Sequence, residues 1–111
     1  MRLLDQLEQL RRANRLAQLC RQIVGRSYAP VRESAEPGAA RMSLAEARGY
    51  VRAKATPVLR AEITSVLQSE PSLGAWAQEV LMEHASRHIV ETVLKDVRRI
   101  AAPPVVRRMA A

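Results

Sequence analysis

Aromatic residues are scarce in this chain of 111 residues, which contains no phenylalanine, one tryptophan and two tyrosines. A platform that stacks single-stranded nucleic acid needs several aromatic side chains, so this composition excludes one. The single cysteine, Cys20, excludes a disulfide framework and any zinc site built on several cysteines. No apolar run approaches the roughly 18 residues of a membrane span, so we expect no transmembrane segment and no membrane partner.

Sequence motifs that carry chemistry are missing as well. The chain has no glycine-rich phosphate loop, no cysteine pair and no GxSxG motif. We therefore expect no enzymatic activity and no cofactor. Asp5 and Glu8 interrupt the apolar stretch that a secretory signal would need, so we expect a cytoplasmic protein.

Aliphatic residues and alanine supply most of the apolar 48% of the chain. This content excludes a disordered protein and suits one small domain. Apolar residues recur at helical spacing, and no segment alternates as a strand would. We predict an all-α fold: a small helical bundle, or a helical hairpin with an additional N-terminal helix joined by a linker.

Glycine, serine and proline residues set the expected boundaries between the segments of the chain. Residues 1–25 are predicted as an amphipathic helix that stops at Gly25. Residues 26–42 carry two serines and two prolines without a sustained apolar period, and they are predicted as a flexible linker. Residues 43–102 are predicted as a helical hairpin, and residues 103–111, which begin with two prolines, as a disordered tail.

Within the hairpin, Ser43 and Glu46 have the spacing of a capping box at the start of a helix. Pro57 then either kinks this helix or splits it in two. Ser72 is expected to cap the last helix. The hairpin core is predicted to include Val51, Leu59, Ile63, Leu67, Trp76, Val80 and Leu81.

The apolar stripe of each predicted helix changes sides along its length. A helix in a simple bundle keeps one apolar stripe. The segments therefore either break into shorter helices or pack half of their length against another chain. The residues expected to contact another chain are Leu3, Leu4, Leu7 and Leu10 in the first helix and Val93 and Val97 in the last.

The net charge of +7, with 18 basic and 11 acidic residues, is typical of proteins that bind a polyanionic partner. Arginine and alanine are so frequent that the composition of a GC-rich bacterial genome is an alternative source of this charge. Residues 69–92 are net acidic, which argues against a recognition helix there. The candidate phosphate-binding residues are Arg11, Arg12, Arg15, Arg48, Arg52, Arg98 and Arg99.

His84, His88 and Glu91 have the spacing of neighbours on one helix face and are the candidate metal ligands. They lack the HExxH pattern, and histidines at a protein interface are the competing interpretation. We expect a non-catalytic interaction or assembly protein that self-associates or binds another helical protein. The alternatives are a basic accessory protein that binds nucleic acid non-specifically, and a metal-dependent enzyme that uses these three residues.

Overall fold

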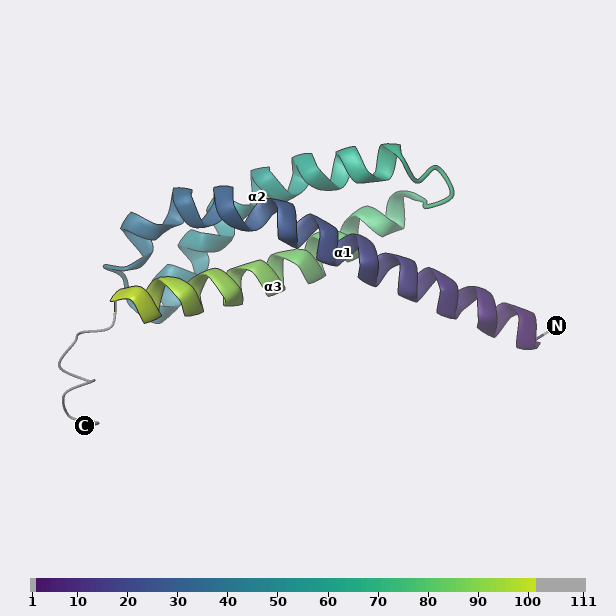
Figure 1. Cartoon of the computed structure of the whole chain (residues 1–111), viewed down its shortest axis with the longest axis horizontal. Helices are drawn as coiled ribbons and strands as arrows, with labels where there is room; N and C mark the ends of the chain where they lie inside the picture. The colour runs from purple at the N-terminus through teal and green to yellow at the C-terminus, as the bar shows by residue number, and fades with distance from the viewer. Residues whose placement is uncertain (1, 102–111) are drawn as a thin grey trace.

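Residues 2–101, which the computed structural model describes, form three long helices. They are α1 (Arg2–Ala39), α2 (Leu44–Gln68) and α3 (Ala75–Ala101), and no strand occurs among these described residues. Each helix contacts both of the others. The chain runs up, down and up, so α1 and α3 point the same way (Figure 1). The predicted all-α fold is confirmed.

The predicted flexible linker over residues 26–42 is wrong, because α1 continues unbroken through Gly25 and on to Ala39. Two prolines, Pro30 and Pro37, lie inside this helix, and each removes a backbone hydrogen-bond donor. Tertiary packing outweighs that cost, since most helical stability in proteins comes from burial of a face. The buried residues recur every fourth position: Leu19, Ile23, Ser27, Val31, Ala35 and Ala39.

The same spacing of four recurs in the other two helices. Because a helix has 3.6 residues per turn, each step of four turns the stripe by about 40° around the axis. Helices that pack on such rows cross one another, since these rows are inclined by about 26° to the helix axis. Figure 1 shows α1 and α3 crossing in this way. The residues concerned are Ala47, Val51, Ala55, Leu59 and Ile63 in α2, and Ala77, Leu81, Ala85, Ile89, Val93 and Val97 in α3.

The winding stripes account for the change of sides in the sequence. The helices neither break nor need another chain along these stripes, because crossing neighbours cover them. Val93 and Val97 are 0% and 1% exposed within this chain. Their prediction as contacts for a second chain is therefore wrong.

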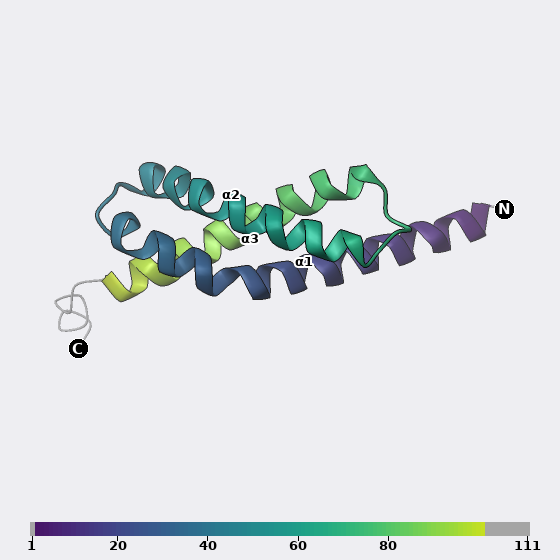
Figure 2. The same cartoon turned by 90° about the horizontal axis from the view of Figure 1, so that it is seen from above.

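The start of α2 agrees with the prediction from the sequence, whereas the start of α3 does not. The Ser43 hydroxyl accepts a hydrogen bond from the Glu46 backbone N–H at 3.3 Å. Pro57 lies inside one continuous helix, which bends along its length (Figures 1 and 2). Ser72 does not cap α3, which begins three residues later at Ala75. Trp76 is 47% exposed, so its prediction as a core residue is wrong.

The turn between α1 and α2 is tightly packed. Tyr50 of α2 lies against the last turn of α1, where a Cβ on Gly38 would come within 2.8 Å of the tyrosine ring. Glycine at this position therefore permits the close approach of the two helices. The predicted tail, residues 103–111, lies outside the described residues.

One end of α1 extends beyond the bundle. At about 1.5 Å per residue, 38 residues make α1 about 57 Å long, whereas the 27 residues of α3 span about 40 Å. Figures 1 and 2 both show the N-terminal part of α1 continuing past the turn between α2 and α3. Residues 2–15 are all exposed.

Candidate functional site

Residues 2–15, which we call the extension of α1, carry the four leucines that the sequence predicts as contacts for another chain. Their exposed fractions are 68% for Leu3, 67% for Leu4, 45% for Leu7 and 60% for Leu10. At about 100° per residue, Leu3, Leu7 and Leu10 line one side of the helix, opposite the buried Leu19. We call Leu3, Leu4, Leu7 and Leu10 together the leucine stripe. No part of the described chain buries it.

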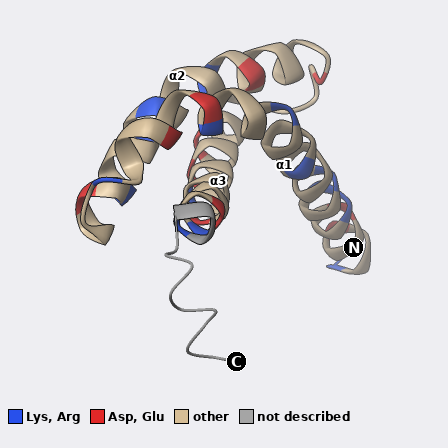
Figure 3. Ribbon diagram, turned by 60° about the vertical axis from the view of Figure 1, so that its left-hand side comes forward, with Lys and Arg blue, Asp and Glu red and all other residues tan. Residues whose placement is uncertain are grey.

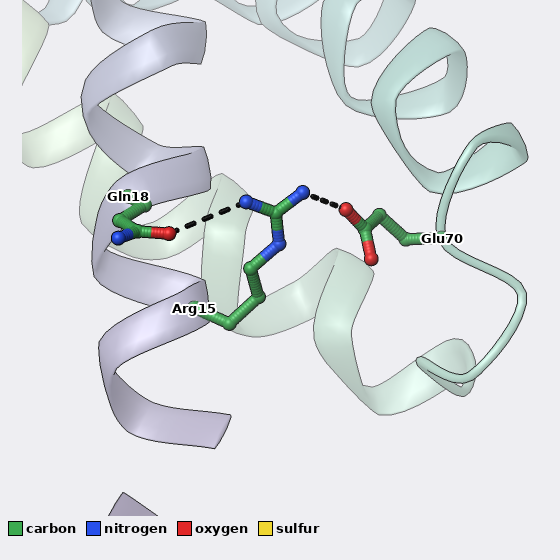
Figure 4. Close-up of polar contacts among 3 residues, drawn as sticks. All are labelled: Arg15, Gln18 and Glu70. Atoms are coloured by element: carbon green, nitrogen blue, oxygen red, sulfur yellow. Dashed lines mark hydrogen bonds and ion pairs between the residues drawn. The ribbon is translucent and has the colours of Figure 1, made fainter. Parts of the chain in front are cut away.

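Arg15 marks the point where α1 leaves the bundle. Its guanidinium forms an ion pair with Glu70, in the turn between α2 and α3, and donates a hydrogen bond to Gln18 at 3.3 Å (Figure 4). The side chain of Arg15 is 48% exposed, so solvent screens the pair and its contribution to stability is below about 1 kcal/mol. The pair joins α1 to the turn between α2 and α3 at the place where the extension begins.

A groove of about 950 Å³ lies between α1 and α3, next to the leucine stripe. Its α1 wall is formed by Ala13, Leu16, Ala17, Cys20 and Arg21. At about 100° per residue, Ala17 and Arg21 lie on the same side of α1 as Leu3, whereas Leu16 and Cys20 are turned toward the core. Its α3 wall includes Val80 and Leu81. The stripe and the groove therefore meet along α1. Sequence reasoning missed this groove, because small residues such as Ala13 and Ala17 signal it only once α3 is placed beside them.

Cys20 also lines the groove and is partly buried. Burial raises the pKa of its thiol, and the nearby Arg21 only partly opposes that effect. A raised pKa leaves little thiolate at neutral pH, which disfavours a nucleophilic role.

The candidate metal ligands His84, His88 and Glu91 are exposed residues that line the α3 side of the groove. Glu91 forms an ion pair with Arg48 of α2 at 3.1 Å. Among the described residues, no three His, Cys, Asp or Glu side chains gather as a set that could hold a metal ion. The structure therefore places these three residues along a groove wall rather than in a ligand cluster.

At the far end of the groove, the Tyr28 hydroxyl donates a hydrogen bond to the Asp96 carboxylate and so links α1 to α3. Partial burial and this hydrogen bond raise the pKa of the tyrosine. Beside them, the Ser27 hydroxyl is buried, and it has no hydrogen-bond partner among the described residues. The hydrogen bond between Tyr28 and Asp96 joins the two groove walls.

The candidate phosphate-binding arginines are not gathered on one face. Figure 3 shows basic and acidic residues interspersed over all three helices. Arg15 and Arg48 are engaged with glutamates, and Arg98 donates to the backbone carbonyl of Met42 at 3.4 Å. Arg11, Arg12 and Arg52 are exposed, and the side chain of Arg99 lies outside the described part. Nucleic-acid binding stays a prediction.

No known protein family, curated protein or solved structure matches the chain. None of the helices within residues 2–101 combines the length and the apolar character needed to cross a membrane.

Proposed function

We propose that this chain is a non-catalytic helical interaction protein that self-associates through the leucine stripe of α1. The observation that supports the proposal is the exposure of the stripe, 45–68% for its four leucines, on a part of α1 that no other helix within residues 2–101 covers. A contiguous exposed apolar patch of this kind is typical of an interaction site. The helical form of the extension favours helix-on-helix packing with its partner.

The energies involved indicate a reversible association. Complete burial of a leucine contributes about 1.5–3 kcal/mol, and half-exposed leucines have roughly half of this left to gain. Four leucines then supply about 3–6 kcal/mol from each copy, against about 4–15 kcal/mol that association costs. The balance predicts complexes that form and dissociate with concentration.

The test is the mass of the protein in solution as its concentration rises from micromolar to submillimolar. We expect the wild-type mass to rise above that of one chain. The double substitution Leu7→Glu and Leu10→Glu is expected to hold the protein as a monomer, because charge on the stripe opposes its burial. Both positions lie beyond the bundle, so the thermal unfolding transition should persist.

The matched control is Leu44→Glu, because Leu44 is 47% exposed but lies at the start of α2. This variant should associate as the wild type does. A wild-type protein that stays monomeric throughout would overturn self-association. Equal loss of association in the control would show that the leucine stripe is not the surface used.

A further inference from the structure

The groove between α1 and α3 and the leucine stripe are complementary surfaces that one molecule cannot bring together. Residues 2–10 and the groove-lining Ala13 and Ala17 belong to the same unbroken helix. The stripe can reach this groove only if α1 unwinds. A second copy faces no such restriction.

We propose that the groove of one copy receives the N-terminal segment of α1, residues 2–10, from a second copy. This inference rests on the proposed self-association and specifies what the leucine stripe contacts. In this arrangement, Leu3, Leu7 and Leu10 of the donating copy pack against Ala13, Ala17 and Val80 of the receiving copy.

The dimensions of the two surfaces agree. From Leu3 to Leu10 the segment rises about 11 Å, and the α1 wall from Ala13 to Arg21 rises about 12 Å. The alanines of this wall leave room for a helix to approach closely. The volume of about 950 Å³ is large enough to take several leucine side chains.

The charges of the two surfaces are also complementary. Residues 2–10 carry two acidic residues and one basic residue, Arg2. The groove is lined by three basic residues, Arg21, Arg87 and Lys95, and by two acidic residues, Glu91 and Asp96. Among residues 2–101, neither Arg21 nor Lys95 of the groove has an ion-pair partner. The groove is therefore net basic and the segment net acidic, which favours their encounter. At about 100° per residue Asp5 and Glu8 lie on the side of α1 opposite the three leucines that pack in the groove, so the seated contact itself is apolar.

Two full-length variants separate the donating surface from the receiving one. The first, which can only receive, carries Leu3→Glu and Leu7→Glu and keeps the groove intact. The second, which can only donate, carries Ala13→Arg and Ala17→Arg, which fill the groove at two exposed positions. Its matched control carries Ala53→Arg and Ala61→Arg, at exposed positions of α2 away from the groove.

The measurement is the mass of each variant alone and of their equimolar mixture. We expect each variant alone to lose self-association by about tenfold or more, and the mixture to form a complex of one copy of each. The control should associate as the wild type does. In contrast to the mixture, the wild type can exceed two copies, because each chain both donates and receives.

The failure of this inference differs from the failure of the proposed function. If the wild type associates and the donating variant still associates with itself, the stripe packs on another stripe and the groove proposal is wrong. If both variants remain monomeric and their mixture does too, the stripe and the groove do not meet. A wild type that never associates overturns both proposals.

Cys20 provides a second readout of the groove itself. It is partly buried in the receiving wall, so a helix seated there should slow its alkylation by iodoacetamide. The donating variant is given Cys20→Ser so that only the receiving copy reacts. We expect the rate to fall as the donating variant is added and to stay unchanged when a donor that also carries Leu3→Glu and Leu7→Glu is added. Equal rates with both donors would contradict the proposal.

Discussion

The two parts of α1 obey different spacing rules, and the difference decides which part belongs to the core. Over residues 19–39, buried residues recur every fourth position and wind around the helix, so crossing neighbours cover them. Over residues 2–15, Leu3, Leu7 and Leu10 alternate steps of four and three along one straight side, and every residue is exposed. The winding stripe is typical of packing inside this bundle. The straight stripe is typical of a helix that packs lengthwise along another helix.

Truncation should produce the largest contrast between these two parts. Removal of residues 1–14 is expected to leave a cooperative thermal transition, because residues 2–14 are all exposed. Removal of residues 1–30 should abolish the transition, because it deletes Leu19, Ile23 and Ser27 and uncovers α2 and α3. Circular dichroism during heating measures both. A cooperative transition after the longer deletion would show that the hairpin of α2 and α3 folds alone.

A single charge in the buried stripe should destabilise the monomer by several kcal/mol more than a single charge in the leucine stripe. Val93→Asp puts a carboxylate at a site that is 0% exposed, so we expect about 3 kcal/mol or more of lost stability, or no folded protein. Leu10→Glu, at a site that is 60% exposed, should change the stability of the monomer by no more than about 0.5 kcal/mol. Denaturant titration at low protein concentration gives both values. Similar losses in the two variants would mean that the stripe is buried within the monomer.

Two glycines within residues 19–39 of α1 should respond to substitution in opposite directions, with smaller effects on stability. A Cβ at Gly38 would meet the Tyr50 ring at 2.8 Å, so Gly38→Ala should destabilise by about 1–3 kcal/mol. Outside the backbone of its own helix turn, no described residue lies within 4 Å of a Cβ at Gly25, and Gly25→Ala should stabilise the helix by about 0.5–1 kcal/mol. Denaturant titration of both variants checks these signs. A Gly25→Ala variant that is no more stable than the wild type would contradict a continuous helix at this position.

The smallest effect concerns the contact between Tyr28 and Asp96, which joins the groove walls. Because the pKa of Tyr28 is raised in the folded chain, the neutral phenol favours folding. Its contribution is therefore complete below pH of about 10, the ordinary pKa of tyrosine, and is lost as the pH rises through the folded value. The melting temperature of Tyr28→Phe should accordingly fall less than that of the wild type between pH 9 and pH 11, measured under the same conditions. Equal falls of the melting temperature in both proteins would contradict a stabilising role for the neutral Tyr28 phenol.

Local signals in the sequence predicted the existence of helices but missed the extent of one of them. The Ser43–Glu46 capping box predicted the start of α2, because its hydrogen bonds form between near neighbours. The linker prediction failed because Gly25, Pro30 and Pro37 are read as breakers, whereas the cover that α2 and α3 give Val31 and Ala35 is invisible in a single segment. The spacing of four was present in the sequence and could have been recognised as a winding stripe.

The candidate site was predicted only in part, for a similar reason. The leucine stripe is a property of one helix, so its exposed side was accessible from the sequence. The groove is formed by two helices, and its position depends on where α1 and α3 cross. In a bundle of straight helices the stripe of Val93 and Val97 would be left uncovered, which is why the sequence predicts a second chain there. Crossing helices place the same residues in the core.

Amide hydrogen exchange along α1, measured at low and at high protein concentration, tests the central claim most directly. We predict that residues 19–39 are protected at both concentrations, because their helix is part of the core. Residues 2–14 should exchange rapidly at low concentration and become protected at high concentration, with no such gain in the variant that carries Leu7→Glu and Leu10→Glu. Rapid exchange of residues 26–39 at both concentrations, or protection of residues 2–14 that does not depend on concentration, would contradict the account.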